Sequence, residues 1–336
     1  MCSRNARTPA PENHDHTHTP FRARVTARDA RDARADVRRR AGARRRVSAD
    51  LRDPVVMTDR LRVLTFNLLT LESASGQERH ELVRRLLPDL RPDVVALQEV
   101  TRNPDIDQAA ELLGSAFAIV DLPGSTPHGV GECLASRWAP ADVLPLDRHV
   151  ADHAGEALRA TAVAVELLVP PPLGPLVVVH HKGAYQMQLE HVRERQAVAT
   201  ARFVEDLVSG RPGLPVVLLG DLNAGPDAAS LRFLTGRQSL GGTSVCYQDA
   251  WEAVHAGEPG HTFSPRNPLV RAGEMPLERG RRIDHIMTRS GPHGPLLDAA
   301  DCRLVFDQPV NGVWASDHFG VLAELRRPDH APGSWA

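Results

Sequence analysis

From residue 61 onward, the chain alternates between continuously apolar segments and longer segments whose apolar residues have helical spacing. Residues 214–220, LPVVLLG, contain no charged side chain, which is typical of a strand that is buried on both faces. Comparable segments occur at residues 61–67, 93–100, 175–181, 282–289 and 318–325. Strands of this kind must be covered on both faces, so the sequence predicts an α/β fold whose sheets carry helices on their outer faces.

Two segments between these strands are predicted to be helices. Residues 77–90 place Leu82, Leu86 and Leu90 at helical spacing, and Pro88 is expected to end or kink this helix. A longer helix is predicted over residues 188–209, with Gly210 as its stop. Its expected buried stripe consists of Leu189, Val192, Gln196, Ala199, Phe203 and Leu207.

Polar side chains stand at or beside the ends of the apolar segments. They are Asn67, Glu99, His180, His181, Asp221, Asn223, Asp284, Asp317 and His318. Each motif by itself is more simply explained as a turn or a solvated strand end, but the recurrence at successive strands indicates a ligand-binding crevice. Several carboxylates that meet there repel one another unless a cation is present. An oxygen-rich set without thiolates favours Mg²⁺, or Mn²⁺, over zinc.

The composition divides the chain into three parts. Residues 1–56 are rich in Arg, Ala and Asp and have few large apolar side chains, so we expect a disordered extension. Residues 57–328 hold the periodic pattern and are predicted to form one folded domain that carries the candidate site, and residues 329–336 are expected to be a loose tail. Met57 directly precedes the ordered pattern, which suggests that translation starts there and that the extension is not made.

Charge and cysteine usage bear on location and partners. Residues 1–56 contain 14 arginines and 7 acidic residues, whereas the rest of the chain contains 26 basic and 35 acidic residues. An acidic body is poorly suited to gripping a polyanion, although nucleic acid stays a possible partner. The four cysteines lie far apart, and neither a secretory signal nor a bilayer-spanning apolar run is evident. We therefore expect a cytoplasmic protein, and we expect it to be a monomer.

The ordered set of motifs resembles the endonuclease/exonuclease/phosphatase superfamily, the fold of DNase I and exonuclease III. The resemblance covers roughly residues 60–326 and rests on LTFN (64–67), ALQE (96–99), HHK (180–182) with RERQ (193–196), GDLN (220–223), RRIDHI (281–286) and SDHFGV (316–321). It implies a four-layer α/β sandwich, in which two packed mixed β-sheets are flanked by helices, and metal-dependent cleavage of phosphate esters.

The resemblance also implies a role for each motif residue. Glu99 is expected to be the main metal ligand, with Asn67 and Asp317 close by. Asp221 is expected to orient or deprotonate the attacking water, while Asn223 hydrogen-bonds the phosphate. The pair His318 and Asp284 is expected to stabilise developing charge or to protonate the leaving group.

The sequence departs from the family pattern at two histidines. The family histidine usually follows Thr or Asn and precedes Leu, whereas here His180 precedes His181 and Lys182 follows it. We assign the catalytic role to His181, because His180 then occupies the Thr/Asn position, and the choice between the two stays open. Where the family usually has Tyr after Arg-Ile-Asp, this chain has His285, which we interpret as a packing residue behind the site.

The substrate is much less constrained than the chemistry. Arg159, Lys182 and Arg282 are candidates to line a phosphate path, although the Arg-rich segment around Arg282 is equally well explained as a solvated loop. Three alternatives follow: a phosphodiesterase or phosphatase of unspecified substrate, a DNA or RNA endonuclease, and a catalytically silent binding protein. The third is the weakest, because the complete set of motif residues is present.

Overall fold

The computed structural model describes residues 59–121, 129–147, 150–151, 157–158 and 161–330. The predicted disordered extension and residues 331–336 lie outside the described residues, so the expected domain boundaries stay predictions. Among the described residues, no helix is both long and apolar enough to cross a membrane.

The first sheet has six strands in the order β14-β15-β1-β2-β4-β3. Their bounds are Arg60–Asn67 (β1), Val94–Thr101 (β2), Ala118–Asp121 (β3), Val130–Ser136 (β4), Asp298–Val305 (β14) and Gly320–Arg326 (β15). Strands β1 and β2 are parallel and the other neighbours are antiparallel, so the sheet is mixed as predicted.

The second sheet runs β11-β12-β10-β9-β8-β5, with β13 paired to β12. Its strands are Pro140–Asp147 (β5), Thr161–Leu167 (β8), Leu176–His181 (β9), Val216–Asp221 (β10), Tyr247–Asp249 (β11), Asp284–Gly291 (β12) and Gly294–Pro295 (β13). Only β9 and β10 are parallel among the described pairs of this sheet. A separate short pair joins β6 (Val150–Ala151) to β7 (Ala157–Leu158).

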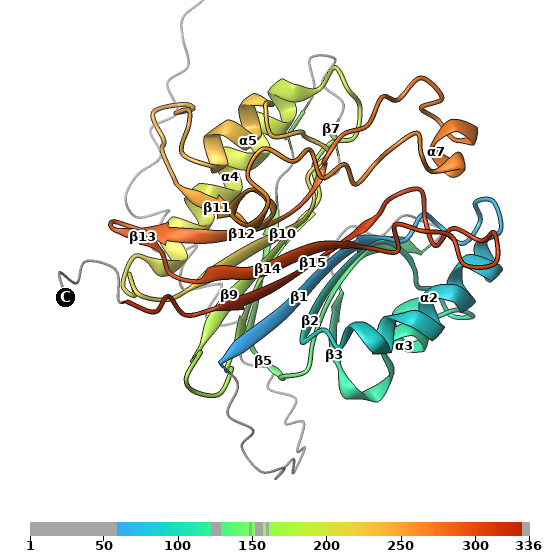
Figure 1. The fold of residues 1–336 in the computed structure, drawn as a ribbon. Coiled ribbons are helices and arrows are strands. Elements are labelled where there is room, and N and C mark those ends of the chain that lie inside the picture. The colour runs from blue at the N-terminus through green and yellow to red at the C-terminus, as the bar shows by residue number, and fades with distance from the viewer. Residues whose placement is uncertain (1–58, 122–128, 148–149, 152–156, 159–160, 331–336) are drawn as a thin grey trace, which may run out of the picture. The chain divides into compact units, whose positions relative to one another are not determined.

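Helices cover the outer faces of both sheets (Figure 1). They are α2 (Gly76–Leu90), α3 (Gln108–Leu113) with the 3-10 turn η1 (Gly114–Ala116), α4 (Glu190–Val208) and α5 (Ala229–Leu234). Two shorter helices lie elsewhere: α6 (Ala250–Val254) contributes to the apolar cluster between the sheets, and α7 (Pro268–Ala272) packs with Phe263 and Ile283. Apolar side chains of α2 and α3 pack on β1 and β2, and those of α4 and α5 pack on β9 and β10. The parallel strands in each sheet therefore lie under a helical layer.

Between the sheets lies a third apolar cluster, to which both sheets contribute. Val63 and Ala96 come from the first sheet, while Val178, Val217 and Ile286 come from the second. The side chains that alternate with them along the strands point outward to the helices. The predicted four-layer α/β sandwich is thus confirmed.

The two predicted helices form with small differences. Helix α2 runs two residues beyond Pro88 and ends where Arg91 takes a left-handed φ of 46°. A proline in the last turn removes only one backbone hydrogen bond, so the helix does not end there. On α4 the buried face is centred on Ala197, Ala201 and Val204, and Phe203 is only partly buried. Small alanines let the helix approach the sheet closely, which places the larger side chains at the margin.

Gly220 on β10 lies so close to the backbone of β9 that it leaves no room for a side chain. Its φ is 144°, and a Cβ atom there would lie 2.1 Å from the carbonyl oxygen of His181. We expect Gly220→Ala to lower the free energy of unfolding by about 2 kcal/mol or more, because both the dihedral and the contact oppose a side chain. Urea denaturation would measure the change. Gly210→Ala is the matched control, since a Cβ there meets nothing within 4 Å, and equal stability of the two variants would contradict the prediction.

Candidate active site

The polar strand ends come together at one edge of the two sheets. In the first sheet Asn67 pairs with Gln98 across β1 and β2, so Glu99 follows immediately at the same edge. In the second sheet Asp221, the last residue of β10, lies opposite Asp284, the first residue of β12. The edge therefore collects side chains from segments more than 200 residues apart.

Asn67 links the two sheets at this edge. Its Nδ2 donates to Oε1 of Glu99 at 3.0 Å and to Oδ2 of Asp221 at 3.1 Å. Its Oδ1 accepts from the backbone N–H of Leu69 at 3.0 Å, which fixes the orientation of the amide. One side chain thus holds a carboxylate of each sheet in place.

Glu99 lies at a break in the β2–β4 register and has a left-handed φ of 58°. This conformation costs free energy for a non-glycine residue and is typical of functional positions. Its Oε1 also accepts from Nζ of Lys182 at 2.9 Å. Burial opposes ionisation of Glu99, but the Lys182 charge and the hydrogen bonds from Asn67 and Lys182 outweigh it and lower the pKa to about 2. Glu99 is therefore a carboxylate at neutral pH.

Asp221 and Asn223 form a tight turn after β10. The backbone N–H of Asn223 donates to Oδ1 of Asp221 at 3.1 Å, and Asn223 takes a φ of 53°. Its Nδ2 donates to the carbonyl oxygen of Gly183 at 3.1 Å, which ties the turn to the loop after β9. Burial, together with the nearby charge of Asp284, raises the pKa of Asp221 against the opposing effect of His318.

His318 and Asp284 form the predicted pair. Nδ1 of His318 lies 2.9 Å from Oδ2 of Asp284, and the ring of Phe263 lies 4.9 Å from the imidazole, centroid to centroid. The hydroxyl of Thr262 accepts from the backbone N–H groups of Ile283 and Asp284 and so positions the start of β12. Burial lowers the pKa of His318, but the adjacent Asp284 carboxylate has the larger combined effect and raises it to about 10.

Two groups of side chains at this edge offer ligands to a divalent metal. Asp221, Asp284 and His318 each offer a ligand atom within 4.8 Å of the others. The carboxylates of Glu99 and Asp317 act on each other electrostatically. Oδ1 of Asp284 is buried and has no hydrogen-bond partner among the described residues. Burial raises the pKa of Asp317, although His318 opposes the shift, so a cation would stabilise this carboxylate as well. The ligand roles predicted for Glu99, Asn67 and Asp317 stay predictions.

Side-chain alternation along β9 separates the two histidines. His180 lies two residues after Val178 and therefore on the same face of β9, which is directed toward the other sheet. Its Nε2 lies 2.7 Å from Nε2 of Gln98. His181 lies two residues after Val179 and therefore on the opposite face, which is directed toward the helical layer. Its Nδ1 lies 3.3 Å from the hydroxyl of Thr200 on α4. The catalytic role of His181 stays a prediction, and the sheet geometry favours His180 as the histidine directed toward the space between the sheets.

The three residues proposed to line a phosphate path differ in where they lie. Arg159 lies outside the described residues. Arg282 is only 5% exposed, and its Nη1 donates to Oδ2 of Asp249 at 2.5 Å. His285 contacts the same carboxylate oxygen at 2.8 Å and the carbonyl oxygen of Ala224 at 3.0 Å. Arg282 is thus buried in an ion pair with Asp249, and His285 contacts the same carboxylate and the loop after the Asp221 turn. The substrate role of Arg282 and the packing role of His285 stay predictions. Of the two candidates that the structure describes, Lys182 is the one that contacts Glu99 at the strand ends.

Two buried arginines hold the loops that form the site, and neither had an expected role from the sequence. Arg79 on α2 donates to the carbonyl oxygens of Leu68, Leu69, Thr70 and Ala74, in the loop after β1. Arg193 on α4 donates to those of Ala184, Gln186 and Met187, in the loop after β9. The signal for Arg193 was its place in the RERQ motif. For Arg79 the signal was a charged residue three positions before the predicted core position Leu82.

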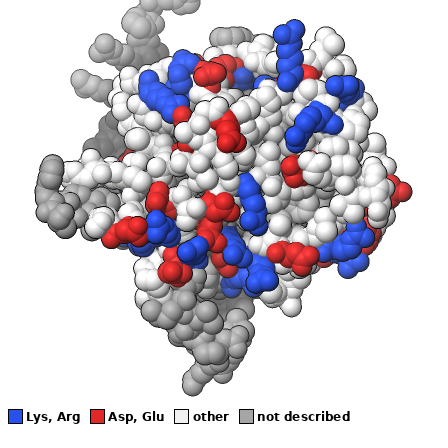
Figure 2. Space-filling view, viewed as in Figure 1, with Lys and Arg blue, Asp and Glu red and all other residues white. Residues whose placement is uncertain are grey.

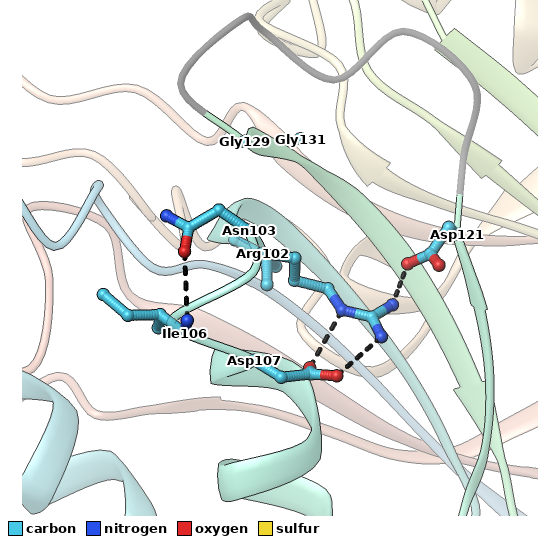
Figure 3. Close-up of a pocket in the computed structure, with 8 residues that line it drawn as sticks. Arg102, Asn103, Ile106, Asp107, Asp121, Gly129 and Gly131 are labelled. Atoms are coloured by element: carbon cyan, nitrogen blue, oxygen red, sulfur yellow. Dashed lines mark hydrogen bonds and ion pairs between the residues drawn. The ribbon is translucent and has the colours of Figure 1, made fainter.

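A separate hollow of about 320 Å³ lies beside the loop after β2 (Figure 3). Arg102 points into it and contacts Asp107 through two nitrogens, at 2.9 and 2.8 Å, and it also pairs with Asp121. Two carboxylates flank this one guanidinium, so the hollow presents no excess positive charge to an anion. The cluster of polar side chains at the strand ends is the better candidate for phosphate chemistry.

An α/β sandwich with carboxylates, an amide and a His–Asp pair at one edge defines a class of phosphoester hydrolases. The model of the Endonuclease/Exonuclease/phosphatase family matches residues 64–318, and the chain belongs to this family. Members of the family hydrolyse phosphate esters and use divalent metals. No curated protein matches the sequence.

Solved structures share the fold at low sequence identity. TDP2 from D. rerio, complexed with a single-strand DNA product, is 18% identical over 80% of this chain and 100% of that chain, with a TM-score of 0.59. The human Nocturnin catalytic domain with bound sulfate is 17% identical over 81% and 96%, with a TM-score of 0.61. An endonuclease/exonuclease/phosphatase from Bacteroides vulgatus is 20% identical over 81% and 100%, with a TM-score of 0.61.

Proposed function

We propose that this protein is a Mg²⁺-dependent phosphodiesterase, with Mn²⁺ as an alternative metal, in which water attacks phosphorus. The observation that carries the proposal is the convergence of Asp221, Asp284 and His318 within 4.8 Å, beside Glu99 and Asn67. This arrangement places a proton acceptor and a proton donor in one crevice, as ester hydrolysis requires.

The chain's own residues account for the proton transfers. Asp221 accepts a proton from the attacking water, and burial makes it a stronger base than an exposed carboxylate. As the new P–O bond forms and the bond to the alcohol breaks, the His318 imidazolium donates a proton to the leaving oxygen. Asp284 holds His318 in the charged form and in this orientation.

Asn223 and the proposed metal ligands are the remaining groups to which we give a role. Asn223 offers its second amide hydrogen to a phosphate oxygen, since the other is used by the Gly183 carbonyl. A divalent metal held by Glu99 and Asp317, with Asn67 beside them, would stabilise the negative charge that develops on the phosphate oxygens.

The face drawn in Figure 2 suits a small or lipid phosphodiester better than a long nucleic acid. Acidic and basic side chains are interspersed on the face drawn in Figure 2, without a continuous basic band. Nucleic-acid binding relies on several Lys or Arg contacts to phosphates. An endonuclease stays the second candidate, because D. rerio TDP2, which shares this fold, was solved with a single-strand DNA product.

Metal removal tests the proposal directly. We expect hydrolysis of a chromogenic phosphodiester with Mg²⁺, a loss of about 100-fold or more with EDTA, and recovery when Mg²⁺ is restored. Supercoiled plasmid is assayed in the same samples, because metal-dependent nicking would favour the endonuclease. Asp221→Asn protein purified in parallel controls for contaminating enzymes. Activity that persists in EDTA would contradict the metal requirement.

A further inference from the structure

Lys182 is the only lysine in the sequence, and every other residue of the Lys and Arg set is an arginine. It follows the last residue of β9 and lies inside the candidate active site, with its Nζ 2.9 Å from Oε1 of Glu99. The side chains of Lys182 and Glu99 are 18% and 29% exposed. A chain that elsewhere uses arginine thus has an ammonium at the carboxylate assigned as main metal ligand.

The ammonium contacts an oxygen that is already shared. Oε1 of Glu99 accepts from Nδ2 of Asn67 at 3.0 Å and from Nζ of Lys182 at 2.9 Å. A metal ion that binds this oxygen must displace at least one of the donors, because a carboxylate oxygen has two lone pairs and both already accept a hydrogen bond. The amide is held on its other side by Leu69 and links the two sheets, so the lysine is the donor that can leave.

The chemistry of lysine suits such a displacement. An ammonium is a compact point charge on a flexible stem, whereas a guanidinium is a rigid planar fork that favours a fixed bidentate pair. The charges of Asp221 and Glu132 also favour the charged form of Lys182, so the ammonium stays in an acidic environment that is not due to Glu99 alone.

We propose that Lys182 is an internal cation that occupies Glu99 in the metal-free protein and competes with the divalent metal for this carboxylate. This inference rests on the proposed metal-dependent function. Lys182 then sets the metal concentration at which the site fills, and the crevice keeps a compensating positive charge before metal arrives. Removing the positive charge should strengthen metal binding, whereas a lysine that only contacted substrate would leave it unchanged.

Direct metal binding is the first test, measured by isothermal titration calorimetry with Mn²⁺ at pH 7 and without substrate. We expect Lys182→Met to bind Mn²⁺ at least about tenfold more tightly than the wild type, because a like charge next to the ligand is gone. Lys182→Arg keeps the charge and should bind no more tightly than the wild type. Arg211→Met is the matched control, since it removes a cation from the ion pair with Glu166, a residue paired with Val177 at the other end of β9.

The single lysine also allows a direct structural readout. Protein labelled with ¹³C at lysine Cε gives one lysine signal, which should shift during an Mg²⁺ titration with the half-saturation found by calorimetry. The shift should be absent in Glu99→Gln at the same Mg²⁺ concentrations. This measurement does not depend on whether Lys182→Met keeps full stability.

The outcomes separate the two proposals. If the wild type binds Mn²⁺ and Lys182→Met binds it equally or less tightly, the competition is refuted while the metal-dependent function stands. A lysine signal that does not move at saturating Mg²⁺ refutes it as well. If neither protein binds Mn²⁺, both the competition and the metal-dependent function are overturned.

Discussion

Asp221→Asn is expected to lower turnover at saturating Mg²⁺ by a factor of about 100 or more, the usual contribution of one general acid–base group. The amide keeps the size of the carboxylate but cannot accept a proton from water. Asp221 is buried against Asn67 and the Asn223 turn, so no solvent-exposed carboxylate can take its place in the same geometry. Initial rates on the phosphodiester identified in the metal experiment measure the effect.

The control for this substitution is Asp206→Asn, which makes the same chemical change on an exposed position of α4. It should keep wild-type turnover. The pH dependence gives a second check: since burial raises the pKa of Asp221, wild-type activity should fall as the pH decreases and this group becomes protonated. Near wild-type turnover of Asp221→Asn, with metal binding intact, would remove Asp221 from the mechanism.

Loss of the His318 imidazole should have an effect of similar size. We expect His318→Gln to reduce turnover of a phosphodiester with an unactivated alcohol leaving group about 100-fold or more, because no imidazolium remains to protonate the leaving oxygen. Asp284→Asn should also be severely impaired, since the 2.9 Å contact to Nδ1 holds His318 charged and oriented. If Asp284 acts through His318, the double variant should be little worse than His318→Gln alone.

His293→Gln is the control for the histidine, because His293 is exposed in the turn between β12 and β13, beyond the opposite end of β12 from Asp284. Near-ultraviolet circular dichroism checks that each variant is folded. Additive losses in the double variant would show that Asp284 acts independently of His318, for example as a metal ligand. A substrate with an activated leaving group should partly restore turnover in His318→Gln, because it needs no proton.

Much of the fold followed from local patterns in the sequence. Continuous apolar runs such as residues 216–219 identified buried strands, because a strand with both faces covered is mostly apolar. The polar residues after these runs identified the edge of the sheets at which Asp221, Glu99 and Asn67 meet. The motif order then indicated the family, which the match over residues 64–318 confirmed.

Other features depended on contacts between distant segments. Arg282 was expected at a phosphate path, but its partner Asp249 lies 33 positions earlier and takes the guanidinium into the interior. The sequence also did not distinguish the directions of His180 and His181, because a one-residue shift of strand register exchanges the two faces of a strand. Only the packed sheets show which histidine faces Gln98 and which faces Thr200.

The sequence by itself determined the kinds of element and the kinds of chemical group at their ends, because periodicity and residue type are local properties of the chain. Tertiary structure alone decided which groups face one another. The contact of Lys182 with Glu99 joins residues 83 positions apart and depends on how two sheets pack. Burial at that junction also sets the ionisation of Asp221 and His318, since the cost of a buried charge depends on its surroundings in space.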